Sequence, residues 1–297
     1  MTVVVGYLAG KSGTAPLHLA VTAARTLRSS LTVVTVVPKP WMTPSPAKVD
    51  AEYAAWAERL AADSAREAEQ CLAVMPPVQE VTFRSQPHRS VSGGLIEVVE
   101  ELGAEMLVLG SSANGQLGQV VVGSAADHLL HSSTVPVAIA PRGYRSPPSA
   151  MLSRITCGYP GTPEAVDLLS RITVAAERLN VPLRVITFAV RGRTMYPPEV
   201  GLHAEDSVLA AWEEQAAAKL EGLRADGVLA PDVEVAVVSG NGWDEALDDA
   251  DWIDGEILAL GTTPRPTVRE GIAEVFLGSH GAKILRFSPV PVLVLPG

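Results

Sequence analysis

The same order of apolar and helical segments occurs twice in this chain, and this duplication restricts its fold more than any other feature. Gly6 and Gly158 are equivalent positions 152 residues apart, near the start of the two copies. Pro136 and Pro291 are equivalent positions 155 residues apart, near their ends. The chain is therefore expected to hold two copies of one unit of ~150 residues, each with its own core.

Strand-like and helical segments alternate within each copy. The expected strands are residues 3–7, 31–37, 78–83, 104–109 and 135–140 in the first copy, and 154–159, 183–189, 233–238, 256–260 and 291–295 in the second. Residues 78–83 alternate, but the strands are on the whole continuously apolar, which is typical of parallel strands buried on both faces. The pattern predicts an α/β fold with two tandem, doubly wound parallel sheets flanked by helices. We place the two domains at residues 1–145 and 151–297, joined by a linker rich in proline and serine over residues 142–150.

The composition excludes several classes of protein. A formal net charge of −10 argues against nucleic acid and anionic membrane surfaces as partners. No apolar run approaches the ~20 residues of a membrane span, and residues 1–6 lack the basic region and cleavage site of a signal peptide. The two cysteines, Cys71 and Cys157, offer neither a disulfide framework nor a zinc spacing, so a cytoplasmic protein is expected.

A glycine-rich loop lies between a buried strand and a helix in the first copy. The strand ends at Gly110, and the helix opens near Gly123 and Ser124. A helix N-terminus that follows such a loop presents backbone N–H groups and a positive dipole end, which together favour a phosphate or another anion. The alternative is a plain strand–loop–helix connection whose glycines only ease tight turns. The residues alone leave both interpretations open.

Three other patterns resemble functional motifs without meeting their requirements. Residues 6–12 come close to a P-loop, but only three residues separate the glycines where that motif needs four. His128 and His131, beside Asp127, lack a third metal ligand on another segment, so we favour a position on the helix surface. The acidic run over residues 244–254 is interpreted as a solvated helix face and turn. We find no pairing of a nucleophile with a base.

With the repeat established, the chain resembles a tandem universal stress protein. The resemblance rests on Gly110-Ser-Ser-Ala113, nine further residues, Gly123-Ser124, and the Pro136-Val137 pair that opens the last strand. It implies a five-stranded parallel sheet of order 3-2-1-4-5 in each half. It also implies a ligand crevice between the first and fourth strands, where the strand order reverses. Family members that bind a ligand in this crevice take ATP there.

The resemblance also assigns residues to the two crevices. Those expected to line a nucleotide site are Gly6, Tyr7, Leu8, Val36, Leu109, Gly110, Ser112, Ala113, Gly123 and Ser124 in the first half, and Gly261, Gly278 and Ser279 in the second.

This chain departs from the family pattern at three places in the expected site. Ala113 replaces the second glycine of the motif, and a Cβ therefore lies where the backbone would approach phosphate. The aspartate that follows the first strand is replaced by Leu8 in one half and by Pro160 in the other. Thirteen residues rather than nine lie within the second-half motif. Arg265 and Arg269 in this longer loop either meet phosphate or flank a surface loop.

The resemblance implies a stress-response protein without enzymatic activity. Because of the departures, we expect each half to bind ATP weakly or not at all, and the second half more weakly than the first. One alternative keeps ATP in the first half through Gly110, Gly123 and Ser124. Another is a slow nucleotide hydrolase, for which the sequence supplies neither a base nor a metal site. Tyr7 and Tyr159 occupy equivalent places, where they either stack on a base or fill its space; we favour the second interpretation.

The last strand of each half is an apolar, uncharged sheet edge, at residues 135–140 and 290–295. An open edge of this kind invites aggregation. Antiparallel pairing of the two edges would hide both inside one chain, so we predict an intramolecular pseudo-dimer. A further homo-oligomer of the tandem chain stays open.

Overall fold

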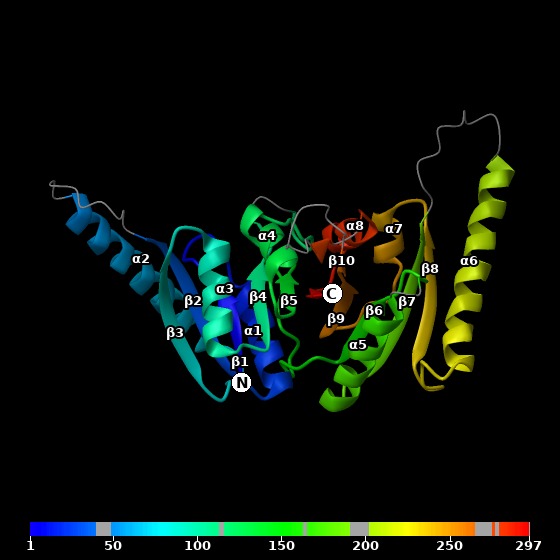
Figure 1. Ribbon diagram of the computed structural model, residues 1–297, viewed down its shortest axis with the longest axis horizontal. Helices are drawn as coiled ribbons and strands as arrows, with labels where there is room; N and C mark the ends of the chain where they lie inside the picture. Colours follow the sequence, from blue (N-terminus) through cyan, green and yellow to red (C-terminus); the bar gives the residue numbers. More distant parts are fainter. Residues whose placement is uncertain are drawn as a thin grey trace.

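The computed structural model describes residues 1–39, 49–112, 116–162, 165–190, 202–264, 275–276 and 279–296. The first half contains β1 (Thr2–Gly6), α1 (Ala15–Leu27), β2 (Ser30–Pro38), α2 (Val49–Leu72), β3 (Val81–His88), α3 (Val91–Leu102), β4 (Met106–Gly110), α4 (Ser124–Ser132) and β5 (Val137–Ala140). The second half contains β6 (Arg154–Gly158), α5 (Ala165–Leu179), β7 (Leu183–Val190), α6 (Leu202–Ala225), β8 (Glu234–Gly240), α7 (Trp243–Asp248), β9 (Glu256–Gly261), β10 (Thr263–Pro264), β11 (Val275–Phe276), α8 (Ser279–Phe287) and β12 (Val292–Leu295). Helices cover both faces of the sheet that these strands form (Figure 1).

The predicted strand order is confirmed in both halves. The main sheet has the order β3-β2-β1-β4-β5-β12-β9-β6-β7-β8, so each half reads 3-2-1-4-5 from its outer edge to the centre. Neighbouring strands within each half are parallel. The strand order reverses between β1 and β4, and again between β6 and β9. These are the two places where an open α/β sheet forms a crevice at the carboxyl ends of its strands.

The two halves are joined through their last strands, as predicted. β12 pairs with β5 in antiparallel fashion, with Val292 opposite Ile139 and Val294 opposite Val137. These four side chains are buried, and Val292 and Ile139 are fully so. The pairing turns two five-stranded sheets into one ten-stranded sheet and leaves only β3 and β8 as outer edges. Two apolar edges are thereby removed from solvent within one chain.

The helices divide into two layers by the core that they cover. α1, α2, α5 and α6 pack on one face, where Leu17, Leu169 and Leu220 are buried. α3, α4, α7 and α8 pack on the other, where Leu95, Leu129, Leu247 and Leu285 are buried. Both faces of the strands are therefore apolar, which explains the continuous hydrophobic runs in the sequence.

Two elements differ from the expectation. β3 extends to His88, beyond the predicted end at residue 83, and passes through Pro87. Proline is tolerated there because β3 is an edge strand and needs no donor on its outer side. In the second half, the segment after Gly261 was expected to be a loop, but it contains the short antiparallel pair β10 and β11.

The linker between the halves packs against α1. The Nδ1 atom of His18 lies 3.0 Å from the hydroxyl of Ser146, and Arg145 donates to Nε2 of His18 at 3.0 Å. The backbone N–H of Leu152 donates to the Thr26 hydroxyl at 2.9 Å. These contacts hold the linker on the first half.

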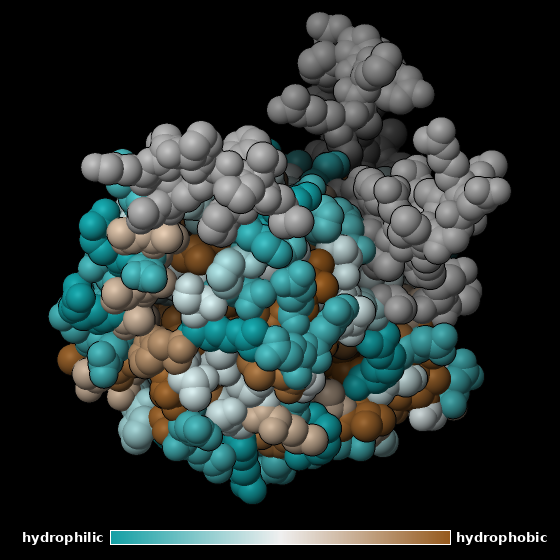
Figure 2. Space-filling model, turned by 60° about the vertical axis from the view of Figure 1, so that its left-hand side comes forward, coloured by the Kyte–Doolittle hydropathy of each residue, from teal (hydrophilic) through white to brown (hydrophobic). Residues whose placement is uncertain are grey.

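Within the described parts of the chain, no helix has the length and apolar composition needed to cross a membrane. On the face of the molecule shown in Figure 2, hydrophobic residues are interspersed with hydrophilic ones. Scattered apolar residues of this kind are normal on a protein surface and do not by themselves mark an interface.

Candidate functional site

Two glycines expected in the first-half crevice serve close packing. Gly6 ends β1, and a Cβ there would lie 3.1 Å from Leu95 and 3.2 Å from Leu109. Gly110 ends β4, and a Cβ there would lie 3.2 Å from the ring of Pro16. The space that these glycines leave is already occupied by side chains of the core.

The loop after β4 uses its backbone N–H groups internally. Ser111 donates to the carbonyl of Ala140 at 3.0 Å, and Ser112 donates to the carbonyl of Val121 at 2.8 Å. The N–H of Val121 in turn donates to the Ser111 hydroxyl at 2.8 Å. These N–H groups are therefore not directed at a ligand. Ala113 lies outside the described residues.

The start of α4 remains open. Gly123 is the N-cap of this helix, and Ser124 is its first residue. A Cβ on Gly123 would meet no heavy atom within 4 Å. Within the described residues of the expected first-half site, the N-terminus of α4 therefore keeps space for an anion.

Tyr7 is part of the core rather than a wall of an open crevice. It is 3% exposed, and its hydroxyl donates to Oε1 of Glu67 at 2.6 Å. Burial, together with the hydrogen bond to Glu67, raises the pKa of Tyr7 above its ordinary value, so the ring remains neutral. In this position the ring is not available to stack on a base.

The loop that follows β1 is fastened to α2. Ala9 donates its N–H to the hydroxyl of Ser64 at 3.1 Å, and Gly10 donates to Oε1 of Glu67 at 3.4 Å. Leu8 donates to the hydroxyl of Ser12 at 2.9 Å. Three successive N–H groups are therefore satisfied within the protein. Sequence reasoning missed Ser64 and Glu67, which belong to no motif, although their spacing of three residues places them on one face of a helix.

The same positions differ in the second half. With the offset of 152 residues, Ser64 corresponds to Ala216 and Glu67 to Lys219, both on α6. Nζ of Lys219 donates a hydrogen bond to the carbonyl of Gly161, in the loop after β6, at 3.2 Å. Tyr159 is 7% exposed, and its hydroxyl donates to the carbonyl of Thr162 at 3.4 Å.

The glycines of the second crevice also permit close packing. A Cβ on Gly158 would lie 2.7 Å from Leu260, and one on Gly261 would lie 2.5 Å from Leu168. Ser279 begins α8. Of the other residues expected in this motif, Gly278, Arg265 and Arg269 lie outside the described residues.

A cleft of about 1070 Å³ lies beside this second crevice, over the carboxyl ends of β7 and β8. α6 forms one wall, and the beginning of α7 together with α8 from His280 to Phe287 forms the other. Three rings line it in series: the centroids of Phe188 and Trp243 are 5.8 Å apart, and those of Trp243 and His280 are 5.4 Å apart. Phe188 is the counterpart of Val36, which was expected to contact a nucleotide in the first half. Sequence reasoning missed this cleft.

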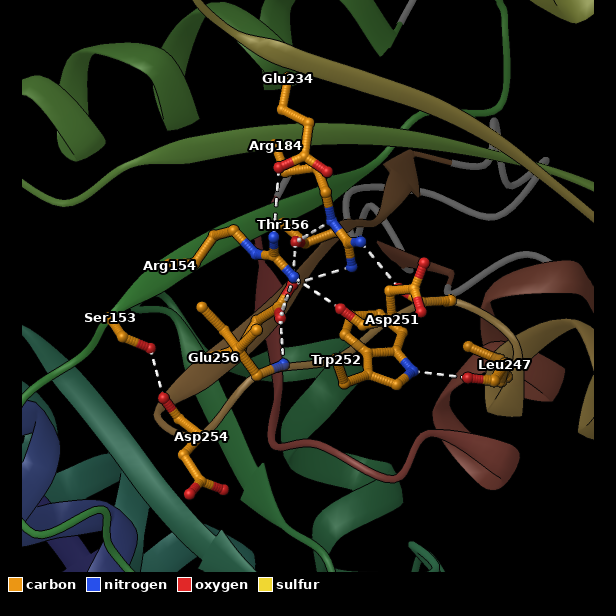
Figure 3. Close-up of polar contacts among 12 residues, drawn as sticks. Ser153, Arg154, Thr156, Arg184, Glu234, Leu247, Asp251, Trp252, Asp254 and Glu256 are labelled. Carbon is orange, nitrogen blue, oxygen red and sulfur yellow. Dashed lines mark hydrogen bonds and ion pairs between the residues drawn. The ribbon is translucent and has the colours of Figure 1, made fainter.

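A buried ion cluster lies toward the amino ends of β6, β7 and β9 (Figure 3). The Glu256 carboxylate accepts from Arg154 at 2.7 Å and from Arg184 at 2.9 Å, and it also accepts from the hydroxyl of Thr156. Arg184 donates further to the carbonyl of Ala250 at 2.7 Å. The carboxylate is completely buried and its bonding capacity is filled, which is typical of a structural cluster.

The histidines of α4 have local partners. Nε2 of His131 lies 3.8 Å from Oδ1 of Asp127, and Nδ1 of His128 lies 3.0 Å from the hydroxyl oxygen of Ser132. Over the described ranges, no three or more histidine, cysteine, aspartate or glutamate side chains are grouped as metal ligands would be.

Comparison with known proteins agrees with this architecture. The model of the universal stress protein family matches residues 1–141 and again residues 151–296. The universal stress proteins Rv2319c of Mycobacterium tuberculosis and Mb2346c of Mycobacterium bovis are each 60% identical over 297 residues, which is 100% of both chains.

Two solved structures share the fold over the whole chain. A universal stress protein from Archaeoglobus fulgidus gives a TM-score of 0.59 at 16% identity, covering 99% of this chain and 98% of that one. A putative universal stress protein from Pseudomonas aeruginosa gives a TM-score of 0.57 at 15% identity, covering 99% of this chain and 92% of that one. The chain belongs to the universal stress protein family and contains two copies of its domain.

Proposed function

We propose that this chain is a stress-response protein that acts by binding rather than by catalysis, and that its first-half crevice holds no ATP. Membership of the universal stress protein family supports the stress-response role. The free cysteines Cys71 and Cys157 are compatible with a reducing compartment, and we include a cytoplasmic location in the proposal.

One observation carries the claim about the first half: the loop after β1 is tied to α2. The N–H groups of Ala9 and Gly10 are used by Ser64 and Glu67, and Glu67 also accepts from Tyr7. A nucleotide that entered between this loop and β4 would have to displace those bonds and the buried ring of Tyr7. The bonds of Tyr7 and Ala9 are partly buried, and a buried polar group left without a partner costs about 1–3 kcal/mol, which opposes binding. The bond of Gly10 is exposed and adds little.

A titration of ATP against a blocked variant tests this claim. Gly123→Trp places a large side chain in the open space before α4 without left-handed strain, because Gly123 has a φ of −80°. If the first half does not hold ATP, parent and Gly123→Trp give the same calorimetric titration, whether or not ATP binds elsewhere. Loss of ATP binding in Gly123→Trp, with the variant still folded, would establish a first-half ATP site and overturn the proposal.

The absence of catalysis is tested separately. ATP is incubated with the purified chain for hours, and the ADP formed is compared with that in a tube without protein. We expect equal amounts of ADP in both tubes. Excess ADP that increases in proportion to protein concentration would favour the slow hydrolase instead.

A further inference from the structure

The linker between the two halves is attached to the first half through a single histidine ring. His18 lies on α1, is 9% exposed, and is contacted by two consecutive residues of the linker. Arg145 donates from Nη1 to Nε2 of His18 at 3.0 Å, and Nδ1 of His18 lies 3.0 Å from the hydroxyl oxygen of Ser146. Both nitrogens of one buried imidazole therefore hold the linker.

These two contacts determine which nitrogen of His18 carries the hydrogen. A guanidinium N–H only donates, so Nε2 must accept the bond from Arg145 through its lone pair. Nδ1 then carries the hydrogen of the neutral ring and donates to Ser146. The complete arrangement thus requires a neutral His18.

Protonation of His18 removes one of the two contacts. In the imidazolium form Nε2 also carries a hydrogen, which faces the N–H of Arg145, and both groups are then cations. The bond from Nδ1 to Ser146 is available in both forms. Burial and the charge of Arg145 both lower the pKa of His18, so the attached linker resists protonation of the ring.

The elements packed against α1 supply no compensating negative charge to His18. β1, β2, β4 and β5 contain neither charged residues nor histidine. On α2, Glu67 and Cys71 lie nearer to one another, and Arg145 lowers the pKa of the Cys71 thiol. Arg25, two turns along α1, donates to a backbone carbonyl in the loop before β3 at 2.6 Å. Arg145 is the charged group that acts on the pKa of His18, and no carboxylate among the described residues offsets it.

A cavity on the other side of the linker leaves room for it to move. The cavity has a volume of about 280 Å³ and lies between residues 144–148 of the linker and residues 253–256 and 289–291 of the second half. Arg145 itself is exposed. The linker can therefore leave α1 without first disrupting a close-packed core.

The second half has no equivalent of this ring. With the offset of 152 residues, His18 corresponds to Ser170 on α5. The hydroxyl of Ser170 donates to the carbonyl of Val166 in its own helix at 2.9 Å, a contact that does not depend on pH. A response to pH through this position is thus confined to the first half and the linker.

We propose that His18 is a pH-sensitive attachment point, and that its protonation on acidification releases Arg145 and frees the linker, residues 144–150, from α1. The antiparallel pairing of β5 with β12 keeps the two halves joined in the released state. Because a free ring binds the proton more readily than the attached one, the released population grows by up to about tenfold for each pH unit below 6.5. The release does not involve a nucleotide, so its failure would leave the proposed function unaffected.

Hydrogen–deuterium exchange at about pH 7.5 and 5.5, corrected for the intrinsic pH dependence of exchange, tests the proposal. The amide of Leu152 reports on the linker because it donates to the Thr26 hydroxyl of α1 at 2.9 Å. At the lower pH, its protection is expected to fall several-fold, up to about tenfold, while β5 and β12 keep theirs. Unchanged protection at Leu152 overturns the proposal. An equal fall in β5 and β12 also overturns it, because protonation would then destabilise the whole fold.

Three variants show whether His18 is responsible. His18→Gln keeps a neutral donor and acceptor but does not titrate, so its linker protection is expected to be the same at both pH values. The matched control is His128→Gln at an exposed position of α4, which should respond as the parent does. Arg145→Ala should raise the pKa of His18, followed by NMR of the ring, and lower linker protection at the higher pH. A parent-like pH response in folded His18→Gln, or an unchanged His18 pKa in Arg145→Ala, overturns the proposal.

Discussion

Replacing Glu256 with alanine is expected to destabilise the second half strongly. The side chain of Glu256 is completely buried, and its two oxygens accept from Arg154 at 2.7 Å, Arg184 at 2.9 Å and the N–H of Ile253 at 2.9 Å. Without the carboxylate, the guanidinium groups of Arg154 and Arg184, 13% and 3% exposed, lose the buried charge that they share. The half-exposed Glu234 still faces Arg154, but Arg184 loses its carboxylate partner. Burial already lowers the pKa of Arg184, an effect that Glu256 opposes and Arg154 reinforces.

The magnitude follows from the burial of this cluster. Removing one partner of a buried ion pair costs about 3–5 kcal/mol, because the remaining charge is left uncompensated. For a domain of this size, ~1 kcal/mol lowers the melting temperature by roughly 2–4 °C, so a decrease of roughly 6–20 °C is expected. Urea unfolding followed by circular dichroism gives the free energy, and a thermal melt gives the temperature.

Glu234→Ala is the matched control. Glu234 bonds the same Arg154 at 3.1 Å, but its side chain is 54% exposed, so its loss should cost only about 0–1 kcal/mol. If Glu256→Ala is no more destabilising than Glu234→Ala, the buried cluster does not stabilise the fold and the reasoning is refuted. A double variant in which Arg184→Met accompanies Glu256→Gln should recover part of the loss, since one buried cation is then removed.

Three further predictions concern the first half and the joint between the halves. Burial, reinforced by Arg145, lowers the pKa of His18 below its ordinary value of 6.5. As the pH falls, the unfolded chain therefore binds a proton at His18 before the folded chain does. The free energy of unfolding should therefore fall as the pH drops below about 6.5, and His18→Gln should flatten that dependence in urea titrations; an unchanged slope would contradict it. Glu67→Ala should speed amide exchange at residues 9–10, measured by mass spectrometry, whereas unaltered exchange would mean that the loop is held otherwise. Ala138→Asp places a carboxylate in the fully buried β5–β12 joint and should lower the unfolding midpoint far more than Leu117→Asp at a 76% exposed position; equal effects would contradict the importance of the joint.

The fold could be predicted because its determinants are local or repeated. Continuous apolar runs indicate parallel strands, and the 152-residue offset between Gly6 and Gly158 indicates two copies. The pairing of β5 with β12 followed from the need to cover two apolar edges. The extension of β3 through Pro87 was missed because proline suggests an end of a strand, unless the strand is known to lie at an edge.

The candidate site could be predicted only in part. Gly6 and Gly110 were expected to line a nucleotide site, but the side chains around them come from α1, α3 and β4, which sequence spacing does not place. The contacts that close the first-half crevice come from Ser64 and Glu67, which lie far in sequence from the loop after β1 that they hold. The cleft depends on how α6 packs beside β7, a tertiary property. The offset nevertheless pairs Glu67 with Lys219, and comparing the two copies position by position offers a signal for this difference.

The first-half crevice, closed by the contacts of Tyr7, Ser64 and Glu67, is expected to hold no ATP. Hydrogen–deuterium exchange across the whole chain, with and without ATP at saturation, tests this expectation most directly. We predict the same exchange at residues 6–12 and 121–128 in both states. Slower exchange at these residues in the presence of ATP would contradict it.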